Sequence, residues 1–241
     1  MKLMKNTLIT AYWLTTVALF IFALVLVFTW TPTESTMGDV QKIFYLHFPV
    51  AINTFLACLV NFIASLAYLW TRRRKYDDLA VASATVGVLL CTIVLMTGMI
   101  WGKSAWGEWW TWSPRLTFSL LLWLLYASYL MVRPSIESTT RRALVAAVYG
   151  VVAFLDVPLV WLSVRLMPDI HPNTIALEPK MWLTVAAFAL PVTMLSFGLI
   201  FSRYALYRRE NDRVEARQQE EEFNETADAA ATLYHQGGLT S

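Results

Sequence analysis

The sequence predicts an all-α integral membrane protein with six transmembrane helices. Of its 241 residues, 57% are apolar and only 15% are charged, whereas soluble domains have roughly 45–50% apolar and about 25% charged residues. Six stretches carry the roughly 20 mostly apolar residues that cross a hydrocarbon core. Such continuous runs satisfy their backbone hydrogen bonds as helices, not as barrel strands. This composition excludes a soluble enzyme and a disordered protein, and a net charge of only +2 argues against nucleic-acid binding.

The six spans are predicted in order along the chain. The first is too long for the apolar core of a signal peptide and lacks a following cleavage site, so it is expected to remain as a helix. The fourth is the shortest, and the fifth contains Asp156 and Pro158. The predicted limits are residues 8–30, 48–70, 79–100, 116–132, 143–164 and 181–202.

Lysine and arginine are distributed unequally between the two sets of loops. Fourteen of the 19 fall on the side that holds both termini, and five fall on the other side. Because short loops rich in these residues stay in the cytoplasm, both termini are predicted to be cytoplasmic. The three external loops are then residues 31–47, 101–115 and 165–180.

The chain is predicted to divide into a membrane domain, residues 1–209, and an acidic cytoplasmic tail, residues 210–241. The tail carries eight acidic residues, and its role is interpreted as solubilising rather than as partner docking. The mixed charge of residues 208–222 is typical of a solvated helix. Flexibility and disorder are expected beyond that helix.

The second external loop holds five of the eleven tryptophans. An interfacial aromatic belt explains one or two at each helix end, but not five in one short loop. If residues 106–110 are helical, three of the indoles share a face that suits a large planar apolar ligand. Arg115 beside them suits a carboxylate on that ligand, since a guanidinium binds a carboxylate through two hydrogen bonds. The five are Trp101, Trp106, Trp109, Trp110 and Trp112.

Two histidines, His47 and His171, fall on the same predicted face of the membrane as this loop. Two imidazoles can occupy opposite axial positions of one haem iron. Haem also has a planar apolar ring for the indoles and propionates for Arg115, so one ligand accounts for all three external loops. The absence of a C-x-x-C-H motif argues against covalent haem attachment to this chain.

These motifs resemble those of a known family. Residues 101–117 resemble the tryptophan-rich (WWD) signature of haem-handling proteins in cytochrome c biogenesis. The segments around His47 and His171 resemble the two flanking histidine motifs of the haem exporter protein C family (CcmC), over about residues 8–205. The sequence departs from the family at Ser113, because the signature reads W-D-x-R where this chain has Trp-Ser-Pro-Arg. Glu108 is the acidic residue closest in sequence that could compensate.

The resemblance implies transient, non-covalent binding of haem b at the periplasmic face of the bacterial inner membrane, with no bond-making catalysis by this multi-pass chain. His47 and His171 would be the axial ligands, and the five loop tryptophans with Arg115 would form the platform and the chaperone contact. The implied partners are a periplasmic haem chaperone, the ATPase and membrane subunits of an ABC transporter, and a small single-helix subunit. ATP hydrolysis would belong to the ATPase subunit.

Asp156 is the only acidic residue within a predicted span. An intramembrane carboxylate usually faces a bundle interior or a cavity, which makes it a candidate functional acid. A local hydrogen bond near a kink at Pro158 explains it equally well.

Three alternatives to haem delivery differ from it in the features that they require. A transmembrane cytochrome b would need histidine pairs inside its spans, which the predicted spans lack. A cytochrome c synthase-type member of the same superfamily would have more spans and further embedded histidines. A membrane scaffold with an interfacial tryptophan belt would bind no haem.

Overall fold

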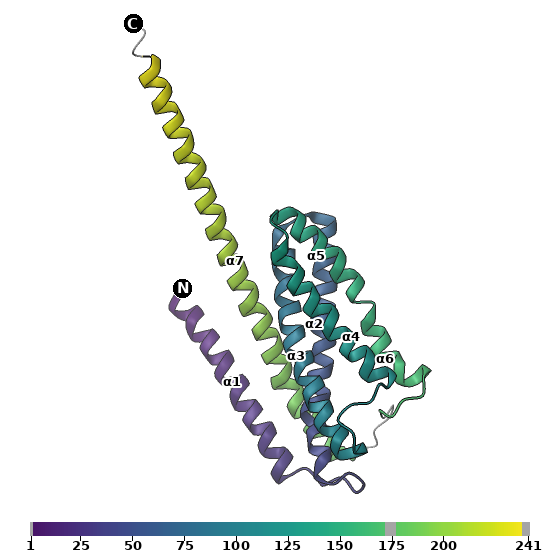
Figure 1. Ribbon diagram of the computed structural model, residues 1–241. Coiled ribbons are helices and arrows are strands. Elements are labelled where there is room, and N and C mark those ends of the chain that lie inside the picture. The colour runs from purple at the N-terminus through teal and green to yellow at the C-terminus, as the bar shows by residue number, and fades with distance from the viewer. Residues whose placement is uncertain (1, 172–176, 238–241) are drawn as a thin grey trace.

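The computed structural model describes residues 2–171 and 177–237, and this part of the chain forms helices and loops without a β-strand. Six segments are long and apolar enough to cross a membrane, which confirms the predicted fold class. Figure 1 shows them as a bundle of roughly antiparallel helices. The helices are α1 (Lys2–Thr29), α2 (Phe44–Thr71), α3 (Arg74–Trp106), α4 (Pro114–Val132), α5 (Thr139–Ala153), α6 (Asp156–Leu166) and α7 (Pro179–Gly237), with short 3-10 turns η1 (Asp39–Ile43) and η2 (Arg133–Ser135).

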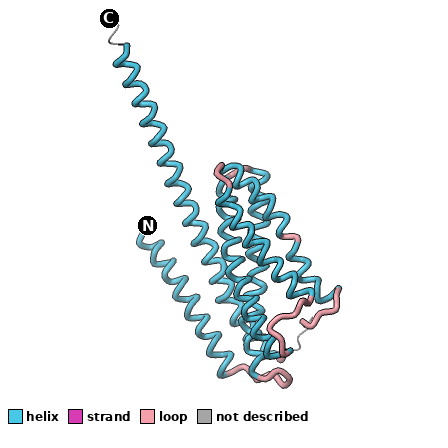
Figure 2. Tube along the Cα trace, in the orientation of Figure 1, coloured by secondary structure: helices cyan, strands magenta, loops and turns pink. Residues whose placement is uncertain are grey.

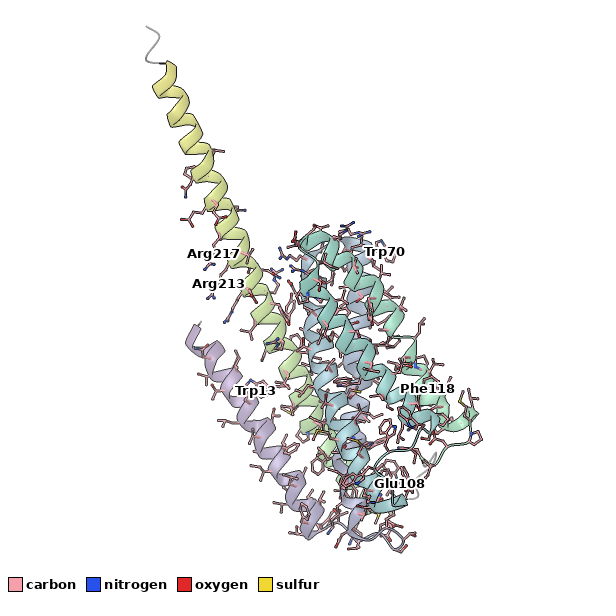
Figure 3. All side chains as sticks on the ribbon, viewed as in Figure 1. Trp13, Trp70, Glu108, Phe118, Arg213 and Arg217 are labelled. Carbon is pink, nitrogen blue, oxygen red and sulfur yellow. The ribbon has the colours of Figure 1, made fainter. Side chains whose placement is uncertain are left out.

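Helix α1 lies apart from α2 to α6 and packs along α7 (Figure 1). The two helices approach closely at Gly198, where a Cβ atom would lie only 2.8 Å from the ring of Tyr12 and 2.9 Å from that of Trp13. The Tyr12 hydroxyl also donates a hydrogen bond of 2.5 Å to the carbonyl of Met194. Figure 3 shows Trp13 on α1 beside α7. A small residue on α7 therefore lets two aromatic side chains of α1 approach its backbone.

The fifth span is broken into α5 and α6 by a turn at Phe154 and Leu155, seen as a short loop in Figure 2. Proline has no N–H, and its ring clashes with the carbonyl four residues earlier, which interrupts a helix. Pro158 stands four residues after Phe154, so it accounts for the position of the break. The predicted span survives as one crossing, Thr139–Leu166, with Asp156 in the first turn of α6.

The described parts of the three loops predicted to be external lie together at one end of the bundle (Figure 2). Residues 172–176 of the third loop lie outside the described part. The turn between α2 and α3, η2 and the start of α1 lie toward the opposite end (Figure 1). This grouping agrees with the predicted threading, and the assignment of the loop end to the outside stays a prediction.

Helix α7 runs without interruption from its membrane segment to Gly237. It includes residues 208–222 and also the region where the sequence predicts disorder; the alanine, glutamate and glutamine there have high helix propensity. Near the start of this extension, the side chain of Asn211 donates to Asp78 and accepts a 2.9 Å hydrogen bond from Arg74. Figure 3 shows Arg213 and Arg217 farther along, clear of α2 to α6. The domain boundary and the flexibility of the tail stay predictions.

Candidate functional site

A cavity of about 530 Å³ lies at the loop end of the bundle, lined mainly by α2, α3, α4 and α6. Sites for small molecules and cofactors typically measure about 300–1,000 Å³. Its walls are largely aliphatic and aromatic, with a few polar groups near the loops. Six of the eight predicted site residues line it: His47, Trp101, Trp106, Trp110, Arg115 and His171.

His47 is the fourth residue of α2, because that helix begins at Phe44, four residues before the predicted span. Its Nδ1 lies 2.8 Å from the hydroxyl oxygen of Thr97 on α3. The hydroxyl of Thr97 donates its single proton to the backbone carbonyls of its own helix, which lie 2.7 Å (Ile93) and 3.2 Å (Val94) away. The hydroxyl oxygen is then the acceptor for a proton on Nδ1, which leaves Nε2 of His47 with a lone pair. A neutral imidazole in this tautomer is suited to ligate a metal through Nε2.

Both histidines contact the ring of Trp101, which is only 2% exposed. The ring centroid of Trp101 is 6.3 Å from that of His47 and 6.0 Å from that of His171. His171 also makes an edge contact with Trp106 at 6.5 Å. The start of α2 and the third loop, which are far apart in the sequence, therefore bring both imidazoles to one aromatic cluster.

Residues 106–110 do not form one helix, so the condition for a shared helical face of three indoles is not met. Helix α3 ends at Trp106, and Gly107 follows with a positive φ of 83°. Glycine adopts that left-handed conformation without steric cost and commonly ends helices. Lys103 completes the helix end by donating from Nζ to the Gly107 carbonyl at 2.7 Å. Trp106 and Trp110 therefore reach the cavity from a helix end and a loop, not from one helix face.

Trp109 and Trp112 do not line the cavity and are 57% and 76% exposed. The ring of Trp112 meets the ring of Trp110 edge-on, with centroids 5.8 Å apart. The loop thus divides its tryptophans into a cavity-facing set and an exposed pair, which the linear sequence does not indicate.

Arg115 lies in the first turn of α4 and is held by two other segments. Its backbone N–H donates to Oδ2 of Asp169 at 2.7 Å, and its Nη2 donates to the carbonyl of Trp161 at 3.4 Å. Its Nε is buried without a hydrogen-bond partner in the described part of the chain. The guanidinium therefore retains donor capacity at the cavity wall.

Sequence reasoning missed several residues around the cavity. Trp161 and Arg165 both line it, and the guanidinium of Arg165 stacks 3.6 Å from the ring centroid of Trp161. Their i, i+4 spacing on α6 was the available signal, because such residues are neighbours on a helix. The roles of Thr97 and Asp169 become evident only from their contacts with His47 and Arg115, from which they are separated by 50 and 54 positions in the sequence.

Two acidic residues and Ser113 lie outside the cavity lining. Asp156 is 4% exposed, and neither carboxylate oxygen has a hydrogen-bond partner among the residues described. It precedes the cavity-lining Val160 by one helical turn. Glu108 is exposed at the loop end (Figure 3). Ser113 is the residue before α4 and makes no side-chain cap hydrogen bond.

The fold and the site together define a class of protein. It is a multi-pass membrane protein in which histidine, tryptophan and arginine side chains surround one apolar cavity suited to a planar ligand. The family model described as Heme exporter protein C matches residues 1–224. Heme exporter protein C of Paracoccus denitrificans is 32% identical over 181 residues, covering 74% of this chain and 75% of that protein. The chain belongs to the Heme exporter protein C family.

Two further relatives show the breadth of the similarity. Heme exporter protein C of Escherichia coli strain K12 is 28% identical over 153 residues, which are 63% of this chain and 62% of that protein. Cytochrome c biogenesis protein CcsA of Prochlorococcus marinus is 40% identical over 85 residues. That alignment covers 35% of this chain and 27% of the CcsA protein, so the likeness is local.

Proposed function

We propose that this protein handles haem in cytochrome c biogenesis: it binds haem b non-covalently at the cavity and hands it to a periplasmic haem chaperone. The observation that carries the proposal is the placement of His47 and His171 on one cavity with three tryptophans and Arg115. Family membership supports it independently. The protein acts by holding and delivering its cargo, without a catalytic step of its own.

The chemistry of the cavity fits haem. Nε2 of His47 has the lone pair that iron needs, and His171 supplies the second imidazole. The indoles of Trp101, Trp106 and Trp110 offer flat apolar surfaces for a porphyrin. During binding the Trp101 ring must shift or the porphyrin must enter beside it, because this indole contacts both imidazoles.

Two guanidinium groups support recognition of the two propionates. Arg115 and Arg165 both line the cavity, and Trp161 holds both, one through its carbonyl and the other through its ring face. Neighbouring like charges repel one another, and an anion between them removes that repulsion. The pair therefore favours a ligand with two carboxylates on the same edge.

The exposed pair Trp109 and Trp112 is the proposed contact for the chaperone. Exposure of a tryptophan side chain to water is unfavourable, and tryptophans frequently contribute a large share of the binding energy at protein interfaces. They continue from Trp110, which lines the cavity, so a docked chaperone would lie beside the bound haem.

The remaining proposed partners act elsewhere on the molecule. The lipid bilayer surrounds the helices, and the ATPase and membrane subunits of an ABC transporter and a small single-helix subunit complete the complex. The proposed location is the bacterial inner membrane with the haem site on the periplasmic side, following the distribution of Lys and Arg. Asp156 is retained as a candidate functional acid near the cavity.

The test is the absorption spectrum of the protein purified in detergent and supplemented with haemin. We expect a six-coordinate, low-spin spectrum typical of two imidazole ligands. Replacing His47 or His171 with alanine should change this spectrum or lose the haem, whereas His235→Ala should do neither. A wild-type protein that stays colourless after supplementation would contradict the proposal and favour a scaffold.

Delivery is tested separately by adding the purified chaperone to the haem-loaded protein. Transfer of haem to the chaperone supports delivery. Attachment of haem to an apocytochrome by this protein alone, with no chaperone, would instead favour the synthase-type function.

A further inference from the structure

We propose that Asp169 is a positioning residue for His171. The same carboxylate caps the start of α4. An aspartate at residue 113, where the family signature has one and this chain has Ser113, would provide that cap from within the same segment. The inference rests on the proposed function only in taking His171 as a haem ligand. Its basis is one side chain that joins the third loop to α4.

The carboxylate of Asp169 accepts two backbone hydrogen bonds. Oδ1 accepts from the N–H of His171 at 2.8 Å, and Oδ2 accepts from the N–H of Arg115 at 2.7 Å. The first bond closes an Asx turn, in which an aspartate fixes the backbone two residues later. The second spans 54 residues of sequence. One side chain therefore determines the position of His171 relative to α4.

The N–H of Arg115 is a helix-terminal donor that needs a partner. The first N–H groups of a helix have no acceptor within the helix, and Pro114 has no N–H, so that of Arg115 is the first available. A carboxylate at this place also interacts favourably with the positive end of the helix dipole. Asp169 thus provides a cap from outside the helix.

Ser113 occupies the N-cap position of α4, the position whose side chain usually caps the start of a helix. It precedes α4 in an extended conformation, yet its side chain makes no capping hydrogen bond. Its hydroxyl is buried and has no partner in the described part of the chain. An aspartate at residue 113 would be a favoured N-cap residue. With serine there, the carboxylate comes from the third loop, and capping of α4 becomes coupled to the position of His171.

This coupling extends to the groups proposed to bind haem. The side chain of Arg115 lines the cavity, and the ring of His171 packs against Trp101 and Trp106. Loss of the Asp169 carboxylate would release the backbone of His171 and the first turn of α4 together. A replacement carboxylate at residue 113 would restore only the turn.

The experiment compares Asp169→Ala, the double variant Ser113→Asp/Asp169→Ala and the control Glu108→Ala, which removes an exposed acid from the neighbouring loop. The two backbone hydrogen bonds accepted by Asp169 tether the third loop to α4. Hydrogen exchange in lipid nanodiscs without haem reports on this tether. Electron paramagnetic resonance and absorption of the ferric haem complex report on axial ligation. Helix content and gel-filtration profile establish that each variant is folded.

We expect Asp169→Ala to accelerate exchange of both the Arg115 and His171 amides. Haem retention should fall about tenfold, the scale at which losing support for a ligating histidine weakens metal binding, and part of the haem should become high-spin. The double variant should regain slow exchange at Arg115 but neither slow exchange at His171 nor low-spin haem. Glu108→Ala should match the wild type.

Unchanged exchange at His171 in Asp169→Ala would overturn the tether, and this readout needs no haem. Full recovery of low-spin haem in the double variant would overturn the positioning role, because capping alone would then suffice. A wild type that binds no haem would instead reject the proposed function, so the two failures are distinguishable.

Discussion

The hydroxyl of Thr97 on α3 lies 2.8 Å from Nδ1 of His47 on α2, and it donates to the backbone carbonyls of its own helix, 2.7 Å (Ile93) and 3.2 Å (Val94) away. This arrangement assigns the proton of the imidazole to Nδ1 and the lone pair to Nε2. The imidazole packs closely against α3 at Gly98, where a Cβ atom would lie 3.4 Å from Cε1 of His47.

Replacing Thr97 with valine removes the acceptor while keeping the shape of the side chain. The imidazole then loses the bond that fixes its tautomer and orientation. We expect haem affinity to fall about 10- to 100-fold, as for lost outer-shell partners of metal-bound histidines. Equilibrium titration with haemin measures the change. Thr97→Ser, which keeps the hydroxyl, is the matched control, and equal weakening by serine and valine would argue against the tautomer role.

The two sets of tryptophans should have different roles. Trp106→Ala and Trp110→Ala remove cavity walls and should weaken haem binding, whereas Trp109→Ala with Trp112→Ala should leave binding intact and slow transfer to the chaperone. Haemin titration measures the first property, and stopped-flow transfer to the purified chaperone measures the second. Normal transfer by the Trp109/Trp112 double variant would contradict the proposed chaperone contact.

The two arginines at the cavity predict selectivity for free propionates. Haem dimethyl ester lacks both negative charges, and we expect it to bind about tenfold more weakly than haem, the scale of one hydrogen bond to a charged group. Arg115→Gln or Arg165→Gln should reduce this preference. Arg141→Gln, at the start of α5, should preserve it. Equal affinity of the wild type for the acid and the ester would refute recognition of the propionates.

The general fold could be predicted because the length of an apolar run reports directly on membrane crossing. The break in the fifth span also had a local cause in Pro158. The end of α3 had a signal as well, since Gly107 follows Lys103 in a pattern common at helix ends. A shared face of three indoles would have required the helix to continue across Gly107, and the spacing of the tryptophans alone does not establish that.

The candidate site was only partly predictable, for a different physical reason. Residue type indicates that His47 and His171 are suited to iron and that indoles are suited to a planar ring. It does not indicate which indoles face the cavity, because that depends on how a loop returns to the bundle. The contacts of Thr97 and Asp169 bridge 50 and 54 residues, so one sequence alone carries no pattern for them.

The last prediction concerns stability at the opposite end of the bundle. Both guanidinium Nη atoms of Arg133 donate to the carboxylate of Asp77 at 2.7 Å, and the two side chains are only 13% and 10% exposed. Removing one member leaves a poorly solvated charge, which commonly costs about 3–5 kcal/mol. Arg133→Met should therefore lower the unfolding temperature strongly, while the apolar double variant Asp77→Leu/Arg133→Met should recover most of the loss. Thermal unfolding in detergent measures both. An Arg133→Met protein as stable as the wild type would show that the pair contributes no net stability, and a double variant no better than the single would assign the loss to packing instead of an uncompensated charge.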